Sequence, residues 1–424
     1  MKILFVYGNI YSWGGIQTWL IRIAPKLRAR GHEVTLLTRE MSGPNDVTSE
    51  IVDRLASDAT LLFAGRHWFR APRSLRPPLG EQDVLFACGL EALLLAALVQ
   101  QHLTPAAKIV AGVFSPREYC WKTSRLSRRW SQHVAERLVR RLPLRNFVFS
   151  TNGMARQTGE CLSRDLSESP VFPIPIDTER LRPAKGRSVN PHKIVSVSRL
   201  TPYYTHNSQM IRVIRELRDR GHNFTYHVYG EGVARPELEA EARRLLVDDA
   251  VFFHGTVAYD DFAEAIGDAF LYIGLATGLI EAAACGIPAL VGIDSQPSPD
   301  TYGFLHETVG NDLGGYVPGH PKYRITERVL WLVGRTDEQY RQIEAASRAR
   351  AEEFGLDRLL PRLIDILERA DRPALPISKG DCILGQLDWI LEAVLLNLGG
   401  HDAMGNRHVR SLPMGEPNPS TSAR

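Results

Sequence analysis

Residues 277–291 read TGLIEAAACGIPALV, a pattern that predicts a short helix followed by a buried strand. A run of small apolar residues ends at Cys285-Gly286, a glycine stop for a helix, and an apolar Ala-Leu-Val follows. The free N–H groups at the start of such a helix favour an anion such as a phosphate. Glu281, one turn further on, can accept two hydroxyl hydrogen bonds, as a ribose would offer. The alternative is that Glu281 only interacts with the helix N-terminus and that the alanines only pack tightly.

The beginning of the chain predicts a strand, a glycine loop, a helix and a second strand. Residues 2–7 are apolar, Gly14-Gly15 lies in the loop, apolar residues recur at helical spacing from Ile16 to Leu27, and residues 33–38 form the next strand. This unit opens a doubly wound α/β sheet. Because the loop lacks the GxGxxG fingerprint, no nicotinamide cofactor is expected.

The same pattern begins again at Lys193. A strand over 193–198, a loop over 199–207, a helix over 209–220 and a strand over 224–229 are predicted. The first helix ends in Arg30-Gly31-His32 and the second in Arg220-Gly221-His222. The repeat therefore predicts two facing Rossmann-like domains, as expected for a chain too long for one ordinary domain.

Residues 279–288, LIEAAACGIP, resemble the donor-site signature of the family 4 glycosyltransferases, which are retaining GT-B enzymes that use nucleotide-sugar donors. The segments 198–200, 229–232 and 253–255 resemble further parts of that donor domain, and the resemblance extends from about residue 2 to residue 370. It implies an acceptor-side domain over 1–181, a linker over 182–192 and a nucleotide-sugar-binding domain over 193–375. We expect an extra amphipathic C-terminal helix over 376–400 and a disordered tail over 401–424, which is rich in Gly, Pro and Ser.

The resemblance also implies which residues hold the donor. Arg199 matches the arginine that binds the diphosphate and is the expected catalytic residue, whereas Tyr204 stands where the family has a lysine. Glu281 matches the second of two glutamates, the one on the ribose, and Ile273 replaces the first. His206 and Arg117 are possible substitute cations, although each is more simply an ordinary residue, since a lone histidine in a polar loop needs no special function. The expected donor-binding residues are Gly14, Gly15, Arg199, Tyr204, Gly230, Gly232, Thr277, Gly278, Leu279 and Glu281.

The expected function is transfer of a sugar from a nucleoside-diphosphate sugar to a glycan or lipid-linked acceptor, in cell-surface polysaccharide or glycolipid synthesis. The resemblance implies retention of configuration, with no metal and no cofactor beyond the nucleotide-sugar co-substrate. The departures at Tyr204 and Ile273 leave open a non-catalytic relative that binds nucleotide or acts as a scaffold. A GT-B sugar epimerase is a third hypothesis.

The segment from Arg117 to Arg145 is strongly basic and interleaved with aromatic and aliphatic residues. A basic helix with an apolar face is typical of proteins that lie on an anionic bilayer. A solvated helix and a nucleic-acid surface are the alternatives, and the net charge of +3 does not by itself indicate nucleic acid. The residues predicted to face the membrane are Arg125, Arg128, Arg129, Arg137, Arg140 and Arg141.

The five cysteines show neither metal-ligand spacing nor a disulfide framework, which favours a reducing compartment. No secretory signal is evident at the N-terminus. The apolar stretches 84–99 and 382–398 contain acidic residues and are shorter than the ~20 apolar residues of a membrane span. The sequence therefore predicts a cytoplasmic protein, peripheral at the inner membrane face.

Overall fold

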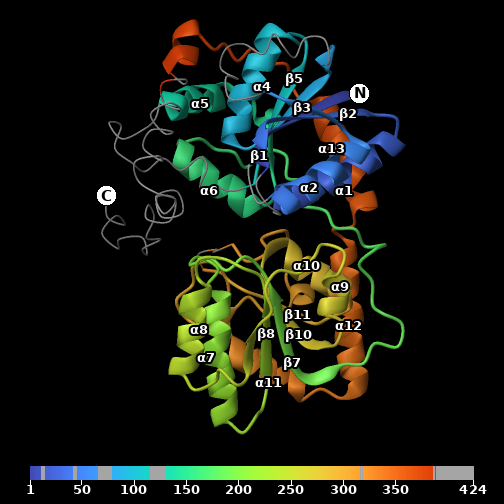
Figure 1. Ribbon diagram of the computed structural model, residues 1–424, viewed down its shortest axis with the longest axis vertical. Helices are drawn as coiled ribbons and strands as arrows, with labels where there is room; N and C mark the ends of the chain where they lie inside the picture. The colour runs from blue at the N-terminus through green and yellow to red at the C-terminus, as the bar shows by residue number, and fades with distance from the viewer. Residues whose placement is uncertain are drawn as a thin grey trace. The chain divides into compact units, whose positions relative to one another are not determined.

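The computed structural model describes residues 1–10, 15–41, 45–64, 79–114, 130–315, 317, 319–384 and 387. The chain forms two compact units (Figure 1). Unit 1 contains Met1–Phe172 and Leu360–Arg424, and unit 2 contains Pro173–Leu359. Each unit has a parallel sheet covered by helices, so the predicted α/β class is confirmed. Gly14, Arg117, Arg125, Arg128 and Arg129 lie outside the described residues.

The sheet of unit 1 has six parallel strands in the order β3-β2-β1-β4-β5-β6. Neighbouring residues of β1 are buried on opposite faces, as expected for a strand with helices on both sides. The strands are β1 (Lys2–Ile10), β2 (Glu33–Met41), β3 (Thr60–Phe63), β4 (Val84–Cys88), β5 (Lys108–Val113) and β6 (Phe147–Phe149).

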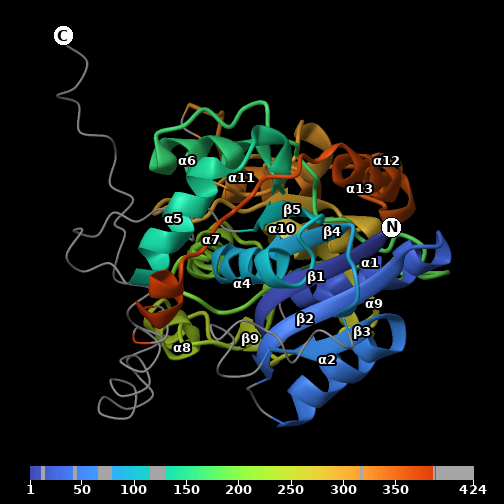
Figure 2. The same cartoon turned by 90° about the horizontal axis from the view of Figure 1, so that it is seen from above.

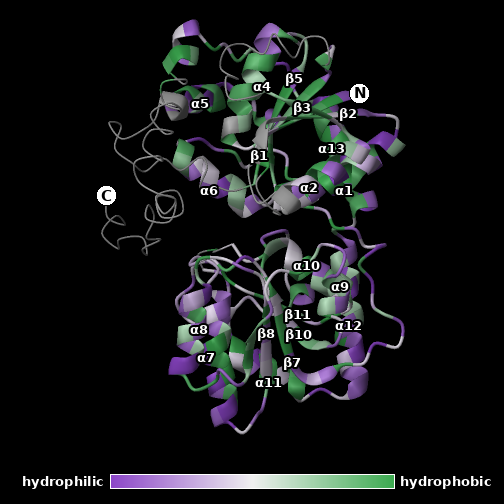
Figure 3. Ribbon diagram, viewed as in Figure 1, coloured by the Kyte–Doolittle hydropathy of each residue, from purple (hydrophilic) through white to green (hydrophobic). Residues whose placement is uncertain are grey.

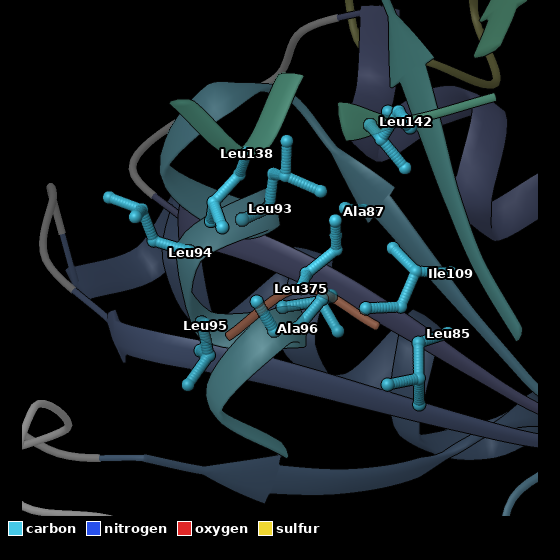
Figure 4. Packing of buried hydrophobic residues seen from close by; sticks show 14 of the residues in the cluster. Leu85, Ala87, Leu93, Leu94, Leu95, Ala96, Ile109, Leu138, Leu142 and Leu375 are labelled. Carbon is cyan, nitrogen blue, oxygen red and sulfur yellow. The ribbon is translucent and has the colours of Figure 1, made fainter. Parts of the chain in front are cut away.

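The core on one face of this sheet is built around a helix that is apolar on all sides, α4 (Leu90–His102) (Figure 4). Its leucines pack against Leu85 and Ile109 of the strands and against Leu138 of α5. The apolar stretch 84–99 is thus a buried strand and helix. The remaining helices are α1 (Gly15–Ala29), α2 (Asn45–Asp58), α5 (Trp130–Arg141), η4 (Leu144–Asn146) and α6 (Asn152–Leu162). Across the described part of the chain, each helix is too short or too polar to cross a bilayer.

The chain returns to unit 1 at Leu360, within α13 (Leu356–Arg369). Leu375 and Ile377 are buried in the unit 1 core. The Asn146 side chain donates to the carbonyls of Ile109 (2.7 Å) and Asp371 (2.9 Å) and accepts from the Asp371 amide (3.2 Å). The segment after α13 is therefore an integral part of unit 1.

These boundaries differ from those predicted from the sequence. Residues 360–375 were expected in the second domain, but they belong to unit 1, because an apolar helical pattern does not specify which core it enters. The chain passes into unit 2 at Phe172–Pro173, before the predicted linker over 182–192. Within the predicted C-terminal helix, residues 379–384 and 387 are helical, and the remainder of 385–400 lies outside the described residues, as does the tail over 401–424.

The sheet of unit 2 has five parallel strands in the order β11-β10-β7-β8-β9. Hydrophobic residues concentrate on the strands and polar residues on the outer faces of the helices (Figure 3). The strands are β7 (Asn190–Val197), β8 (Thr225–Tyr229), β9 (Val251–Phe253), β10 (Ala269–Gly274) and β11 (Ala289–Val291), with a separate antiparallel pair of β12 (Asp300–Thr301) and β13 (Tyr323–Arg324).

Two cores lie on opposite faces of this sheet, because Ile194 of β7 points into one and Val195 into the other. The first core is covered by α7 (His206–Asp219), α8 (Arg235–Arg244) and α11 (Ile325–Val333). The second is covered by α9 (Phe262–Ala265), α10 (Ala276–Ala284), η5 (Leu305–Glu307) and α12 (Asp337–Glu352).

In both sheets the first strand of the unit is central, and the chain order reverses beside it. β1 lies between β2 and β4, and β7 lies between β8 and β10. Ligands of doubly wound sheets bind outside the carboxyl ends of the strands at such a switch point. In unit 2 this point is where β7 and β10 end.

Cys161 of α6 is disulfide-bonded, whereas Cys88, Cys285 and Cys382 are free thiols. The bonded Cys161 differs from what a reducing compartment would lead one to expect. In the described ranges, no group of three or more His, Cys, Asp and Glu side chains could hold a metal ion.

Candidate functional site

Helix α10 begins at the carboxyl end of β10, one residue before the predicted threonine and glycine. Its N-cap, Leu275, is extended and makes no side-chain cap, and Ala276 adopts a left-handed conformation with φ +50°. The Ala276 amide donates to the Leu313 carbonyl at 2.9 Å. At the other end, Arg348 of α12 donates to the Ala284 carbonyl at 2.6 Å and complements the negative end of the helix dipole. The N-terminus of α10 is therefore the end that favours an anion.

Gly278 allows α10 to approach the end of β7 closely. A Cβ at this position would lie 2.7 Å from the Tyr272 hydroxyl and 3.2 Å from the Val197 carbonyl oxygen. That hydroxyl donates to the Val197 carbonyl (3.1 Å) and accepts from the Val197 amide (3.3 Å), and burial raises the pKa of Tyr272. Tyr272 thus ties β10 to β7 across the switch point, and a larger residue at 278 would push the helix away.

Glu281 is half-buried on the second turn of α10. Its negative charge reaches the Cys285 thiol, whose pKa is raised to about 11, mainly by burial and further by Glu281. Thr277 and Gly278 are also half-buried, whereas Leu279 is fully buried and can offer only its backbone to a ligand. The proposed contact between Glu281 and a ribose remains a prediction.

Arg199 is exposed in the loop that follows β7. Its positive charge acts on the phenol of Tyr204, the residue that replaces the family's lysine, and lowers the pKa of that phenol against a larger increase from burial. Burial raises the pKa of Tyr204, so the phenol stays neutral and can accept from the guanidinium. Tyr204 is therefore a partner of the cation at this site.

His206 lies at the start of α7 and is completely buried. Its Nε2 atom lies 3.1 Å from the Ser196 hydroxyl and 3.5 Å from the Ser198 hydroxyl. Burial lowers the pKa of His206 to about 3, so the imidazole is neutral near pH 7. His206 is consequently not a substitute for the missing lysine charge, and Arg117, the other candidate, lies outside the described residues.

A buried polar network lies next to the loop that carries Arg199. Asn207 donates to the Ser198 hydroxyl at 3.2 Å and accepts from the Tyr226 hydroxyl at 2.7 Å. Together with His206, these contacts fix the backbone immediately before Arg199. Sequence reasoning missed this network, although Ser196 and Ser198 at the end of an apolar strand, followed by His206-Asn207 at a helix start, were a possible signal.

Gly230 and Gly232 allow the loops after β7 and β8 to run side by side. Their φ angles are +135° and +154°, and a Cβ would lie 1.9 Å from the Ser198 oxygen or 2.2 Å from the Leu200 oxygen, respectively. The amides of Ser198 and Leu200 donate to carbonyls of the β8 loop at 3.0 Å each. Backbone packing by itself requires these two glycines, and their contact with a donor remains a prediction.

Ile273 is completely buried in the core that α7 covers, together with Val213 and Val228. Position 273 of β10, where the resembling family has a glutamate, therefore holds an aliphatic side chain that belongs to the core. In unit 1, Gly15 is the first residue of α1, and a Cβ built there would meet nothing within 4 Å among the described residues, so their packing does not explain this glycine.

In the described part of the basic segment the aliphatic residues pack into the core, while the contact of the arginines with a membrane remains a prediction. The aliphatic residues Val134, Leu138 and Val139 of α5 are buried in the unit 1 core. Arg137 pairs with Asp381 at 2.6 Å, and Arg140 pairs with Glu136 at 2.9 Å. The apolar face of α5 is thus unavailable to lipid, because the spacing that suits a bilayer equally suits a core. Arg137, Arg140 and Arg141 remain on its outer face.

Residues 177–310 match the model of the family described as glycosyl transferases group 1. The match includes Arg199, the β8 loop and α10. Three solved structures of similar fold each align with 87% of this chain. The fold is GT-B. The predicted fold and the predicted resemblance to glycosyltransferases are both confirmed. No curated protein matches the chain significantly.

The first structure is Anabaena HepE in complex with UDP and glucose, with 16% identity, a TM-score of 0.63 and 100% of its chain covered. The second is a Rickettsia africae glycosyltransferase, with 14% identity, a TM-score of 0.62 and 97% coverage. The third is a sucrose-phosphate synthase from Thermosynechococcus elongatus, with 13% identity, a TM-score of 0.61 and 98% coverage.

Proposed function

We propose that this protein transfers a sugar from a nucleoside-diphosphate sugar to a glycan or lipid-linked acceptor, with retention of configuration and without a metal. The observation that carries the proposal is the convergence of two elements at the switch point of unit 2. Arg199 follows β7, the uncapped start of α10 follows β10, and Tyr272 joins the two strand ends. The match to the glycosyl transferase group 1 family over this same region supports it.

The chemistry requires negative charge to be stabilised on the diphosphate as the sugar leaves. Arg199 would supply a fixed positive charge, and the first-turn amides of α10 would supply oriented N–H groups. Glu281 would accept hydrogen bonds from the ribose hydroxyls. We propose uridine as the base to be tried first, because the HepE structure contains UDP.

We further propose a role in cell-surface polysaccharide or glycolipid synthesis, with the protein peripheral at the inner membrane face. Such a location would bring the protein to lipid-linked acceptors. The exposed arginines on the outer face of α5 support an anionic surface as a partner.

The competing function is a non-catalytic GT-B protein that binds a nucleotide. Two observations favour it: Ile273 is a core residue, and a single arginine with a tyrosine partner replaces a pair of cations. A sugar epimerase, the weaker alternative, would convert the donor with no acceptor present.

The test measures UDP release from a panel of UDP-sugars, with and without glycan and lipid-linked acceptors, and UDP binding by calorimetry. We expect UDP release that requires an acceptor, and about 10-fold or greater weakening of UDP binding in Glu281→Ala, from the loss of roughly 1.5–3 kcal/mol. Glu338→Ala, at an exposed carboxylate of unit 2, is the matched control. Binding without turnover would indicate the non-catalytic protein, and isomerised donor without acceptor would indicate the epimerase.

A further inference from the structure

A group of exposed apolar side chains lies near the end of the described chain. Residues 379–384 and 387 are helical, and Ile383, Leu384 and Leu387 are 60%, 37% and 54% exposed. Their spacing places the three side chains on one face of a helix. A cluster of large exposed apolar residues on one helical face marks an interaction surface more often than a chance arrangement.

This helical segment is firmly attached to unit 1. Asp381 accepts from the Ser378 amide (2.9 Å) and hydroxyl (2.8 Å) and from Arg137 of α5 (2.6 Å). Although burial opposes ionisation, these hydrogen bonds and the charge of Arg137 hold the pKa of Asp381 below its usual value. Cys382 packs against the unit 1 core, so the segment presents Ile383, Leu384 and Leu387 outward.

The helical segment that carries these residues lies next to α5 (Figures 1 and 2), to which the Arg137–Asp381 ion pair joins it. The outer face of α5 carries Arg137, Arg140 and Arg141, and Arg145 follows it, all exposed. Glu136 is the acidic residue of α5, and it is paired with Arg140. The surroundings of the apolar group are therefore predominantly positive.

The sequence beyond the described segment continues the same apolar spacing at Ile390, Leu391, Val394, Leu395 and Leu398. An amphipathic pattern beside a basic surface is typical of elements that lie in the interfacial plane of a bilayer.

We propose that Ile383, Leu384 and Leu387, flanked by Arg137 and Arg141 of α5, form a docking surface for an anionic phospholipid bilayer. The apolar side chains enter the acyl boundary, and the arginines lie at the level of the lipid phosphates. The inference deepens the proposed membrane location by assigning the apolar contact to this segment, since the aliphatic residues of α5 are buried in the core. A second copy of the chain is a poorer occupant, because its equally basic surface would be repelled.

The test is flotation of the full-length protein with vesicles of phosphatidylglycerol and phosphatidylcholine, or of phosphatidylcholine alone. We expect salt-sensitive binding to the anionic vesicles only. The triple variant Ile383→Ser, Leu384→Ser, Leu387→Ser should reduce the partition coefficient at least 10-fold, and Arg141→Glu should reduce it several-fold.

The matched controls lie in unit 2. Val309→Ser removes an apolar side chain that is 89% exposed, and Arg341→Glu reverses an exposed arginine; both should leave flotation unchanged. Equal flotation of the wild type and the triple variant would overturn the proposal, as would equal binding of the wild type to both vesicle types. Self-association that the triple variant abolishes, without vesicle binding by the wild type, would identify a second copy as the occupant and also overturn it.

UDP binding measured on the same samples separates this proposal from the proposed function. The triple variant should bind UDP as the wild type does, which would show that the variant is folded. If the wild-type protein floats with anionic vesicles but binds no UDP, the membrane-docking proposal is supported and the donor-site proposal is wrong.

Discussion

The β1–α1–β2 and β7–α7–β8 segments begin their respective units and end their helices in the same way. Gly31 and Gly221 have φ angles of +79° and +84°. The amide of the following histidine donates to the carbonyl of Leu27 (3.2 Å) in unit 1 and of Leu217 (2.9 Å) in unit 2. The repeated Arg-Gly-His sequence thus encodes one helix C-cap used twice.

The two segments differ beneath the loop that joins the first strand to the helix. In unit 1, Trp19 of α1 packs against two phenylalanine rings, with its ring centroid 5.6 Å from that of Phe5 and 5.3 Å from that of Phe86. At the start of the helix, Gln17 of α1 donates to the Tyr7 hydroxyl at 3.0 Å, whereas in unit 2 His206 and Asn207 of α7 are hydrogen-bonded to the serines at the end of β7. The comparison teaches that a shared local unit does not determine the site: the polar layer that fixes the Arg199 loop is a property of unit 2.

The largest effect is expected from Gly230→Ala, compared with Gly221→Ala. A Cβ at 230 meets the Ser198 carbonyl, whereas a Cβ at 221 would have no neighbour within 4 Å in the described part of the chain. We expect a loss of about 4 kcal/mol in the free energy of unfolding for Gly230→Ala, from overpacking and backbone strain, and about 1 kcal/mol for Gly221→Ala. Urea unfolding measures both values. Equal losses would show that the close approach of the two loops is unimportant.

The second largest effect is expected where the C-terminal segment packs into unit 1, and it tests whether the stability of unit 1 depends on that segment. Leu375→Ala should reduce stability by about 3 kcal/mol, because this buried leucine fills the core beneath α4 (Figure 4). Hydrogen exchange should accelerate in β5 and α4 and remain unchanged in β8. Equal acceleration in β8 would contradict the division into units.

Nucleotide affinity should depend strongly on Arg199. Arg199→Ala removes the cation at the end of β7 and should raise the Kd for UDP about 30-fold, which corresponds to roughly 2 kcal/mol. Arg341→Ala, at an exposed arginine of the same unit, is the calorimetric control. An unchanged Kd for Arg199→Ala would remove this residue from the site.

Tyr204→Lys should add a second cation beside Arg199, in the loop that distinguishes unit 2 from unit 1. We expect UDP to bind about 10-fold more tightly, from roughly 1.4 kcal/mol, without a matching gain in turnover, since a cation that also holds the product slows its release. Tyr204→Phe should instead weaken binding slightly, because the polar phenol near the Arg199 charge is lost. If neither variant changes the Kd, the loop does not contact the diphosphate.

The smallest expected effect is on the pH dependence of the free energy of unfolding. The pKa of His206 is lowered from 6.5 to about 3 by burial, so the unfolded chain binds a proton at a pH where the folded protein does not. The stability from a neutral His206 is fully present above pH 6.5 and is lost as the pH falls towards 3. We expect a loss of about 1 kcal/mol between pH 6.5 and 5.5 from this residue. His206→Gln should have a shallower pH dependence in urea unfolding, and identical slopes would contradict the burial of a neutral imidazole.

The sequence by itself determined the features that depend on neighbours along the chain. The α/β class, the repeated opening unit, the helix caps at Gly31 and Gly221 and the helix-to-strand segment at 277–291 follow from periodicity and glycine placement. The resemblance over residues 279–288 identified the donor-side region. These features were predictable because hydrogen bonding and side-chain spacing within a few residues specify them.

Only the tertiary structure decided which surfaces meet. The aliphatic spacing of α5 suits a bilayer and a core equally, and the core of unit 1 covers it. The segment after α13 could have entered either unit, and Asn146 and the pocket for Leu375 place it in unit 1. His206 is polar in sequence yet completely buried, because Ser196 and Ser198 satisfy one ring nitrogen. In each case the partner lies on another element, so neither periodicity nor local propensity contains the information.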